Sequence, residues 1–499
     1  MRTDETQTDG YGHVLKYTGI FGGVQGLNIL VGLVRNKLVA LLLGPSGMGL
    51  ASLYNTTINF ISQSTTLGIS ISAVRHVSEL FDSGDEERIL HFVKVVRAWS
   101  MLTGLLGALV CMLAGPLIAN YAFSWDTHIL SFIMLAPAVA CMAVIGGETA
   151  ILKGARQLKA LALIQLVCVF AALVISVPVY YFYGTAGIVP VIVITTLANL
   201  LATVHYSYKL YPLRLTGNRG ILGEGMGMVR LGMAFVMAGI MGSGAEMLIR
   251  SYINLQGNLP DVGLYNAGYI LIFTYGSVFF SAMESDYFPR LSAVGNDNTA
   301  MREMVNRQIE VSILLAAPLM WILLLGLPLL VEILFSSKFL PVVGMAQVAV
   351  FSIFLRCISL PVSYQTLARG KSMAYMLLEC IYDVLFVTMV IVGYTYWGLL
   401  GAGVALSLSY VIEIVIVVGY TGKSFGYRPT WPVLFYAGVH LLLGIGVYMA
   451  TLLDNCWIHW LAGTSFCLLS LGFSLLILSK KTSLWNKLKK NLLHRNYGA

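Results

Sequence analysis

Fourteen apolar stretches, each long enough to cross a lipid bilayer, follow one another along this chain of 499 residues. A membrane-spanning helix needs roughly 20 apolar residues. Only 11% of the residues are charged, against about 25% in an ordinary soluble domain. In hydrocarbon every backbone N–H and C=O group needs a partner within its own segment, so we predict an all-α polytopic membrane protein. The stretches cover residues 17–43, 48–74, 97–122, 127–151, 159–183, 186–208, 229–253, 264–288, 308–335, 342–368, 372–396, 399–422, 432–452 and 458–479.

The positive charges predict which side of the membrane each loop faces. All but five of the 31 Lys and Arg residues fall in the two tails, in alternate loops, or within about one turn of them. The exceptions are Arg35, Lys37, Arg250, Lys338 and Arg356. Cytoplasmic loops carry the excess of Lys and Arg, so we predict that both termini are cytoplasmic. The net charge of +8 then reflects topology and attraction to anionic lipid, and we expect no nucleic-acid partner.

The loops are too short to hold a catalytic domain. The longest lie near residues 75–96, 209–228 and 289–307, and all three are predicted to be cytoplasmic. The sequence shows no nucleophile elbow, phosphate-binding loop or metal-ligand spacing, and its seven cysteines form no disulfide framework. We therefore expect no enzyme activity, no catalytic residues, no bound metal and no cofactor. A transporter, a channel or a membrane scaffold remains, and the buried charges disfavour a scaffold.

A weak internal repeat divides the chain into two six-span halves. Residues 35–55 and 250–266 each begin with a cation, pass a short Gly/Pro turn, and end in Gly-Leu followed closely by Tyr-Asn. Repeats of this kind usually enclose a central site. The predicted organisation is an N-terminal cytoplasmic tail (1–16), a six-helix bundle (17–210), a cytoplasmic linker (211–228), a second six-helix bundle (229–423), an extra helix pair (424–480) and a basic tail (481–499).

The segment Lys37–Leu50 (KLVALLLGPSGMGL) resembles the first hairpin of O-antigen-type oligosaccharide translocases, which belong to the multidrug/oligosaccharidyl-lipid/polysaccharide exporter superfamily. Val262–Tyr265 (VGLY), Tyr287–Ser292 (YFPRLS) and Ser337–Phe339 (SKF) match in the second half. The resemblance implies a flippase that moves an undecaprenyl-pyrophosphate-linked oligosaccharide from the cytoplasmic to the outer leaflet of a bacterial inner membrane. It implies alternating access, coupling to ions or membrane potential as in an antiporter, contact with membrane lipids, and polysaccharide polymerase machinery as a partner.

Buried cations predict where the pyrophosphate binds. An ionisable side chain inside a membrane is costly unless it is paired or hydrated, which makes it a candidate functional residue. Arg35 and Lys37 lie roughly 12 and 9 Å from the outer end of the first span at 1.5 Å per residue, and Arg250 lies nearer the surface in the seventh. Arginine can bind a phosphate through two hydrogen bonds, although each of these long side chains could instead extend to water. The polar residues predicted to line the substrate cavity are Asn28, Asn55, Asn59, Tyr265 and Asn266.

A second set of charges predicts an ion pair or a coupling site. Arg356 and Asp383 lie about midway across two consecutive antiparallel spans, so we expect them to pair, as a structural clamp or as a coupling site. Glu379, one turn before Asp383, could take up a proton. Glu246 precedes Arg250 by four residues and could neutralise it from the same helix face. The other acidic residues considered are Glu148 and Glu413, inside spans, and Glu284 and Asp286, near enough to a span end to be solvated caps.

Three alternative functions remain open. A lipid-linked peptidoglycan-precursor flippase would handle the same pyrophosphate and is the hardest to exclude. A cation-coupled multidrug exporter of the same superfamily would favour an acidic, aromatic lumen and twelve spans. A membrane sugar polymerase or ligase should carry catalytic residues on a large outward loop, and this chain has no such loop.

Overall fold

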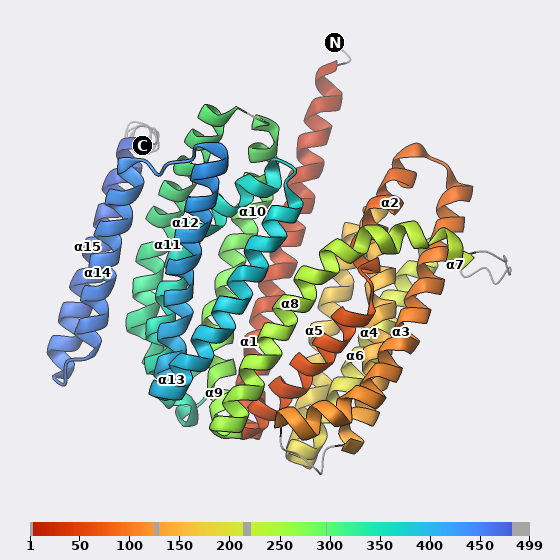
Figure 1. The fold of residues 1–499 in the computed structure, drawn as a ribbon, viewed down its shortest axis with the longest axis horizontal. Coiled ribbons are helices and arrows are strands. Elements are labelled where there is room, and N and C mark those ends of the chain that lie inside the picture. Colours follow the sequence, from red (N-terminus) through yellow and green to blue (C-terminus); the bar gives the residue numbers. More distant parts are fainter. Residues whose placement is uncertain (1–2, 124–128, 213–220, 296, 482–499) are drawn as a thin grey trace, which may run out of the picture. The chain divides into compact units, whose positions relative to one another are not determined.

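The chain is helical throughout the part that its structure describes, as the hydropathy predicts. The computed structural model describes residues 3–123, 129–212, 221–295 and 297–481, and these ranges contain helices and no strand. The chain divides into two compact units (Figure 1). Unit 1 comprises Met1–Leu264 and Ile333–Lys338, and unit 2 comprises Tyr265–Glu332 and Phe339–Ala499.

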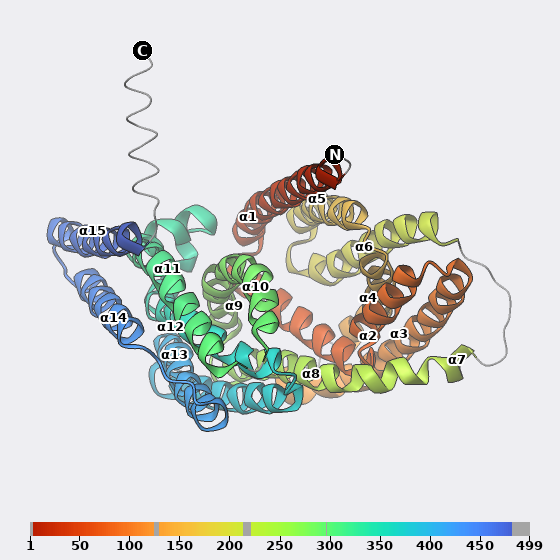
Figure 2. The ribbon, with the colours of Figure 1, turned by 90° about the horizontal axis from the view of Figure 1, so that it is seen from above.

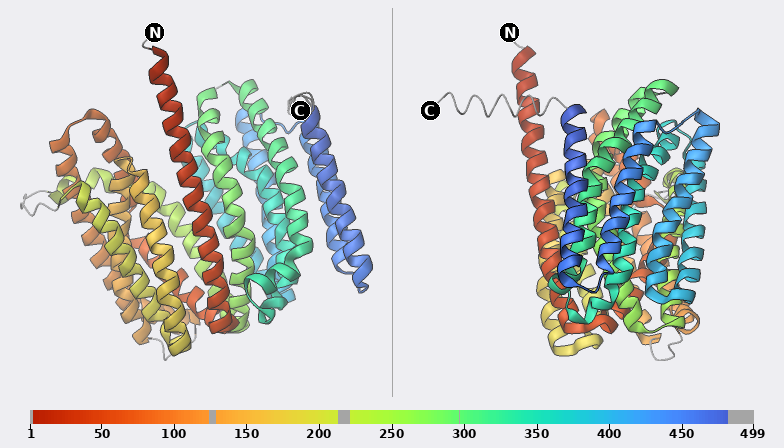
Figure 3. Two further views of the ribbon diagram at one scale, coloured as in Figure 1. Left: turned by 180° about the vertical axis from the view of Figure 1, so that it is seen from behind. Right: turned by 90° about the vertical axis from the view of Figure 1, so that its left-hand side faces the viewer.

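Unit 1 contains the helices α1 to α8 and the first turns of α9. Within it α3 and α6 pack against α4, α5 packs against both α1 and α6, and α2 packs against α4. Figure 3 shows the N-terminal part of α1 from behind. The bounds are α1 Thr3–Thr65, α2 Ile69–Ser83, α3 Glu86–Phe123, α4 Ile129–Gly154, α5 Leu158–Tyr183, η1 Gly184–Gly187, α6 Ile188–Leu210, α7 Ile221–Glu224, α8 Met226–Gln256 and α9 Leu259–Tyr269.

Unit 2 continues from α9 to the end of the described chain. Here α12 packs against the long helix α13, and α14 packs beside α15, as the view from above shows (Figure 2). A π-helical turn, η2, follows α9 directly. The bounds are η2 Ile270–Thr274, α10 Tyr275–Val294, α11 Asn298–Leu334, η3 Ser337–Val342, α12 Val343–Ala368, α13 Ser372–Phe425, α14 Trp431–Thr451 and α15 Cys456–Lys481.

Two of the longest helices are pairs of spans joined at a left-handed glycine. Gly44 in α1 has φ 64° and ψ −173°, and Gly398 in α13 has φ 58° and ψ −141°. Residues with a Cβ rarely adopt such positive φ values, so glycine suits both turns. Pro45 follows Gly44, where its fixed φ favours the first turn of the next helix. The turn predicted between the first two spans is thus confirmed.

The predicted spans coincide with helices. Ten segments of the described chain are long and apolar enough to cross a membrane. Three of them, Gly26–Thr65, Leu158–Leu210 and Ser372–Phe425, each contain two predicted spans or most of two. The seventh predicted span lies in α8, which is 31 residues long. The all-α polytopic fold is therefore confirmed, with one local difference: the second predicted stretch is interrupted at residues 66–68, between α1 and α2.

Glycines let two helix ends in unit 1 approach until backbone contacts backbone. A Cβ added to Gly263 would lie 1.9 Å from the carbonyl oxygen of Pro45, and one added to Gly49 would lie 2.2 Å from that of Leu259. These glycines occupy the Gly-Leu steps of the two repeat segments found in the sequence. Small residues permit such close packing of membrane helices. The two repeat segments therefore contact each other at equivalent positions.

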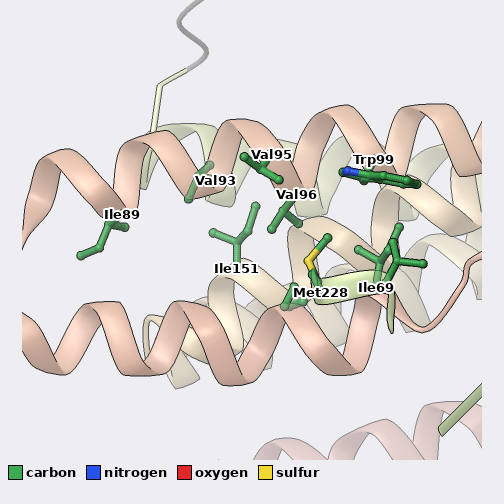
Figure 4. Close-up of a cluster of buried hydrophobic side chains, with 11 residues drawn as sticks. Ile69, Ile89, Val93, Val95, Val96, Trp99, Ile151 and Met228 are labelled. Carbon is green, nitrogen blue, oxygen red and sulfur yellow. The ribbon is translucent and has the colours of Figure 1, made fainter. Parts of the chain in front are cut away.

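A cluster of apolar side chains fixes α2, α3, α4 and α8 together in unit 1 (Figure 4). Ile69 of α2 and Trp99 of α3 are 2% and 7% exposed, and Ile151 of α4 and Met228 of α8 are buried beside them. Ile69 is the first residue of α2. This packing therefore holds the interruption between α1 and α2 in a defined position against α3 and α4.

The extra helix pair packs closely against α11 and is held together internally by polar contacts. A Cβ on Gly444 of α14 would lie 2.5 Å from the ring of Trp321 in α11. Inside the pair, the fully buried His440 contacts the hydroxyls of Ser470 and Ser474 through its two ring nitrogens, at 2.9 and 3.2 Å. These contacts join α14 to α15, and α14 to α11. Of the predicted basic tail, only Lys481 lies within the described residues.

Candidate functional site

Arg35 is a half-buried cation in the first span of unit 1. Its Nε donates to the hydroxyl of Ser176 on α5 at 3.4 Å, and Tyr180, one turn further along α5, is close enough to interact. Both partners are neutral groups, and within the described residues no carboxylate pairs with Arg35. A charged side chain inside a membrane is costly unless it is paired or hydrated. Among the residues that the structure describes, the charge of the Arg35 guanidinium therefore has no counter-ion.

Arg250 of α8, unlike Arg35, has a carboxylate partner. It is 3% exposed, its Nε donates to the hydroxyl of Ser52 on α1 at 2.9 Å, and its Nη1 contacts the Glu246 carboxylate at 3.3 Å. Nη1 also donates to the Glu246 carbonyl oxygen at 3.2 Å. Arg250 and Glu246 therefore bind each other, and Arg250 ties α8 to α1. Direct binding of substrate by Arg250 or Glu246 stays a prediction.

The other predicted binding residues of unit 1 lie along α1. Asn28 and Lys37 are half-buried, whereas Asn55 and Asn59 are exposed. The Asn55 amide donates to a carbonyl one turn earlier in its own helix, at 2.8 Å. Lys37 is two residues from Arg35, or about 200° around a helix with 3.6 residues per turn, so the two cations leave α1 on different sides. Their convergence on one phosphate stays a prediction.

A buried ion pair in unit 1 was missed in the sequence. Arg97 of α3 donates to both carboxylate oxygens of Glu148 in α4, at 2.9 and 3.3 Å, and the Glu148 side chain is 2% exposed. Ser207 of α6 donates to the same carboxylate at 2.5 Å, and the guanidinium lies 4.1 Å from the ring centre of Tyr208. Three helices meet at this pair. Arg97 begins the third predicted span and Glu148 lies near the end of the fourth, so both are near the same predicted side of the membrane. This similar depth is the feature of the sequence from which the pair could have been predicted.

Arg356 of α12 lies among acidic and aromatic side chains of unit 2. Its guanidinium is half-buried and lies 4.8 Å from the ring centre of Phe280. The groups close enough to interact with its charge are Glu284, Glu379, Tyr382, Tyr410 and Glu413. Arg356 is therefore compensated by nearby carboxylates of unit 2, unlike Arg35 of unit 1.

Glu413, one of the additional acidic residues noted in the sequence, belongs to this cluster. Its Oε2 is buried and makes no hydrogen bond of good geometry within the described residues, although the hydroxyl of Ser359 lies close to it. A buried carboxylate oxygen without a partner is costly when it is charged. Asp383 is half-buried on α13 and has interactions of its own. Its pairing with Arg356, and a coupling role for Glu379, stay predictions.

The two remaining predicted binding residues, Tyr265 and Asn266, are the first two residues of unit 2. Tyr265 is 1% exposed, and its ring centre lies 6.2 Å from that of Tyr269. Asn266 is half-buried, and both residues have further interactions within the protein. Their contact with substrate stays a prediction. Within the described residues, no group of three or more His, Cys, Asp or Glu side chains is placed to hold a metal ion.

A polar cavity of about 180 Å³ lies in unit 1 at the interruption between α1 and α2. The chain leaves the helical conformation here because Leu67 and Gly68 have φ values of 50° and 69°. No charged side chain lines the cavity. Its lining includes Ser62, Gln63 and Thr66 at the end of the first helix, Ser70 of α2, Thr103 of α3 and Gly146 of α4.

Comparison with known proteins gives the family. The model of a family described as polysaccharide biosynthesis protein matches residues 38–344, which is more than half of the chain. The chain belongs to this polysaccharide biosynthesis family. No curated protein sequence matches this family member at a significant level.

Solved structures with a similar fold are membrane transporters. The lipid II flippase MurJ in an inward closed conformation is 15% identical, with 90% of this chain and 97% of MurJ covered and a TM-score of 0.69. An inward-facing MATE multidrug transporter of the MOP superfamily is 14% identical, with 80% of this chain and 94% of that transporter covered and a TM-score of 0.63. A MOP superfamily transporter from Pyrococcus furiosus is 14% identical, with 82% of this chain and 93% of that transporter covered and a TM-score of 0.54. The resemblance drawn from the sequence is thus confirmed: this is a multi-pass membrane protein with the MOP fold.

Proposed function

We propose that this member of the polysaccharide biosynthesis family is a flippase for an undecaprenyl-pyrophosphate-linked oligosaccharide. The substrate is the repeat unit of a surface polysaccharide such as O-antigen, moved from the cytoplasmic to the outer leaflet of a bacterial inner membrane. Family membership supports the polysaccharide, and the fold supports transport across a membrane. One protein with this fold is a flippase for lipid II, which supports a lipid-linked substrate and keeps a peptidoglycan precursor as the nearest alternative.

Arg35 is the observation that carries the proposal. Its partners within the described chain are the hydroxyl of Ser176 and the side chain of Tyr180, so its charge lacks a counter-ion. A pyrophosphate would supply that counter-ion through charge-assisted hydrogen bonds, which are stronger than neutral ones. A cationic drug would instead be repelled by this guanidinium. The geometry therefore favours an anionic substrate over the cation substrates of a multidrug exporter.

Unit 2 supplies groups suited to coupling. Glu379 and Glu413 lie close to Arg356, and protonation of either would change the charge balance around that cation. Uptake of a proton there, in exchange for outward movement of substrate, gives an antiporter. Moving two negative charges outward across an inside-negative membrane also releases roughly 4.6 kcal/mol per 100 mV, at about 2.3 kcal/mol per charge. Both driving forces act in the export direction.

The test is leaflet exchange of a fluorescent undecaprenyl-pyrophosphate oligosaccharide in proteoliposomes. Arg35→Ala removes the uncompensated cation, and truncation of one partner of a buried charge pair costs about 2–5 kcal/mol. We therefore expect substrate affinity to fall at least about 30-fold, since 1.4 kcal/mol is tenfold. Arg75→Ala is the control, because Arg75 is exposed and pairs with Glu79 on its own helix. Full exchange by Arg35→Ala would contradict the role of Arg35, and exchange of lipid II alone would establish the nearest alternative.

A further inference from the structure

The cavity of unit 1 contains polar side chains without partners. Ser62, Gln63 and Ser70 line it, and their side-chain polar groups make no hydrogen bond within the described part of the chain. The other two polar side chains are satisfied by helix carbonyls, because Thr66 donates to residue 63 at 3.5 Å and Thr103 donates to residue 99 at 2.9 Å. Ser62 is buried, at 7% exposed, and Gln63 and Ser70 are exposed. Three polar side chains that face one space and are not engaged by the protein can bind a ligand that donates and accepts hydrogen bonds.

The chain interruption beside the cavity is fixed in place. A Cβ on Gly68 would lie 2.5 Å from the carbonyl oxygen of Gly232 in α8, so these two glycines pack backbone against backbone. Inside a membrane, non-helical backbone is tolerated only where it is buried in protein or lines a hydrated cavity. Interrupted membrane helices also mark binding sites in transporters. The break at residues 66–68 therefore forms part of the cavity wall, since Thr66 and Ile69 on either side of it line the cavity.

The lining determines which chemistry the cavity accepts. Hydroxyl and amide groups can both donate and accept hydrogen bonds, and the lining has no charge to bind a phosphate or a cation. Ile69, Met142 and Ala143 supply the apolar part of the wall. The volume of about 180 Å³ is below the roughly 300–1,000 Å³ of sites for drug-sized ligands. One neutral, hydroxyl-rich ring matches these properties, with its hydroxyls on the polar groups and its C–H face on the apolar ones.

We propose that this cavity is a subsite for one neutral sugar residue of the transported saccharide. The assignment rests on the proposed function and extends it, because it places the sugar at the break between α1 and α2, separate from the cation Arg35. Ser62, Gln63 and Ser70 supply the hydrogen bonds to the sugar hydroxyls. Sugar recognition and pyrophosphate recognition then depend on different residues of unit 1.

Two variants alter the cavity without touching Arg35. A Cβ on Gly146 would meet only the Ser70 side chain, at 3.4 Å, so Gly146→Val extends into the cavity without a backbone clash. Gln63→Leu removes the amide at nearly constant volume. Gly419→Val is the matched control, because Gly419 also lies in a helix and its Cβ would have no heavy atom within 4 Å.

The experiment compares binding of two ligands to the full-length protein: undecaprenyl pyrophosphate with the oligosaccharide and the same lipid without sugar. We expect Gly146→Val and Gln63→Leu to weaken binding of the glycosylated lipid at least tenfold, to leave the sugar-free lipid unchanged, and Gly419→Val to change neither. Equal losses for both ligands, or no loss for either, would overturn the subsite.

A second readout separates this inference from the proposed function. Ser70→Cys, in a chain whose native cysteines are replaced by alanine, should react with a small water-soluble thiol reagent and be protected by free oligosaccharide. Protection without leaflet exchange of the lipid-linked substrate would refute the flippase and support the subsite. Exchange without protection of Ser70→Cys would leave the flippase in place and overturn the subsite.

Discussion

Replacing Glu148 by methionine should destabilise the protein more than any exposed charge change. Glu148 is 2% exposed, and it receives two hydrogen bonds from Arg97 and one from Ser207. Its removal leaves the Arg97 guanidinium, 10% exposed, without a counter-ion inside the bundle. Breaking a buried pair by removing one partner costs about 3–5 kcal/mol. The shift in Tm per kcal/mol falls as a protein grows, to about 2–4 °C at 150–250 residues, so we expect Tm of this larger chain to fall by several degrees.

The double variant Arg97→Met/Glu148→Met provides the decisive comparison. Replacing both members of a buried ion pair by apolar residues of similar volume is often neutral or stabilising. We therefore expect the double variant to melt near the wild type and each single variant well below it. The assay is thermal unfolding of the purified protein in detergent, followed by tryptophan fluorescence.

An exposed pair serves as the control. Arg75 and Glu79 are 68% and 57% exposed and one turn apart, and such surface pairs are worth about 0–1 kcal/mol. Arg75→Met should therefore lower Tm by less than about 4 °C. If the two single losses at Arg97 and Glu148 simply add in the double variant, the two residues do not act as a pair and the reasoning is refuted.

Three further changes test other parts of the molecule. Gly263→Val places a side chain on a backbone carbonyl of α1 and should lower Tm by several degrees, whereas Gly32→Val, with no heavy atom within 4 Å of the new Cβ, should not; equal melting would contradict the backbone contact. Glu413→Gln should abolish the response of leaflet exchange to an imposed proton gradient while equilibrium exchange continues, and an unchanged gradient response would remove Glu413 from coupling. His440→Ala leaves two buried hydroxyls of α15 without their partner, at about 1–3 kcal/mol each, and a melting curve identical to the wild type would refute that contact.

Hydropathy predicts most of this fold because the bilayer sets the length of each helix. The sixth stretch, predicted at 186–208, is helical over Ile188–Leu210 as α6. Glycine and proline after an apolar run also predicted the turn at Gly44. The interruption at residues 66–68 was missed because it falls inside an apolar stretch. Gly68 has a positive φ and packs against the backbone of Gly232 in α8, a tertiary contact that hydropathy does not reveal.

The candidate site was only partly predictable, because depth in a membrane can be counted along the chain and side-chain direction cannot. The sequence assigned Arg35 and Arg250 to one predicted pyrophosphate site and left open whether Glu246 neutralises Arg250. The structure separates them, since Arg250 has a carboxylate partner and Arg35 has neutral ones. The contact with Glu246 is local to one helix and could be anticipated from its spacing. The partner of Arg97 lies on another helix, so it needed tertiary structure.

The glycine contact between Gly49 and Gly263 bears on where the chain can flex. Backbone atoms alone meet there, one residue before the boundary of unit 1 at Leu264, so no side chain can rearrange to absorb a displacement. The first irregular backbone beyond that boundary is the π-helical turn Ile270–Thr274. Such turns disrupt the regular hydrogen-bond ladder and occur frequently where proteins work. We therefore expect any bending of this segment to occur at that turn, because the start of α9 is held against α1 by backbone contacts.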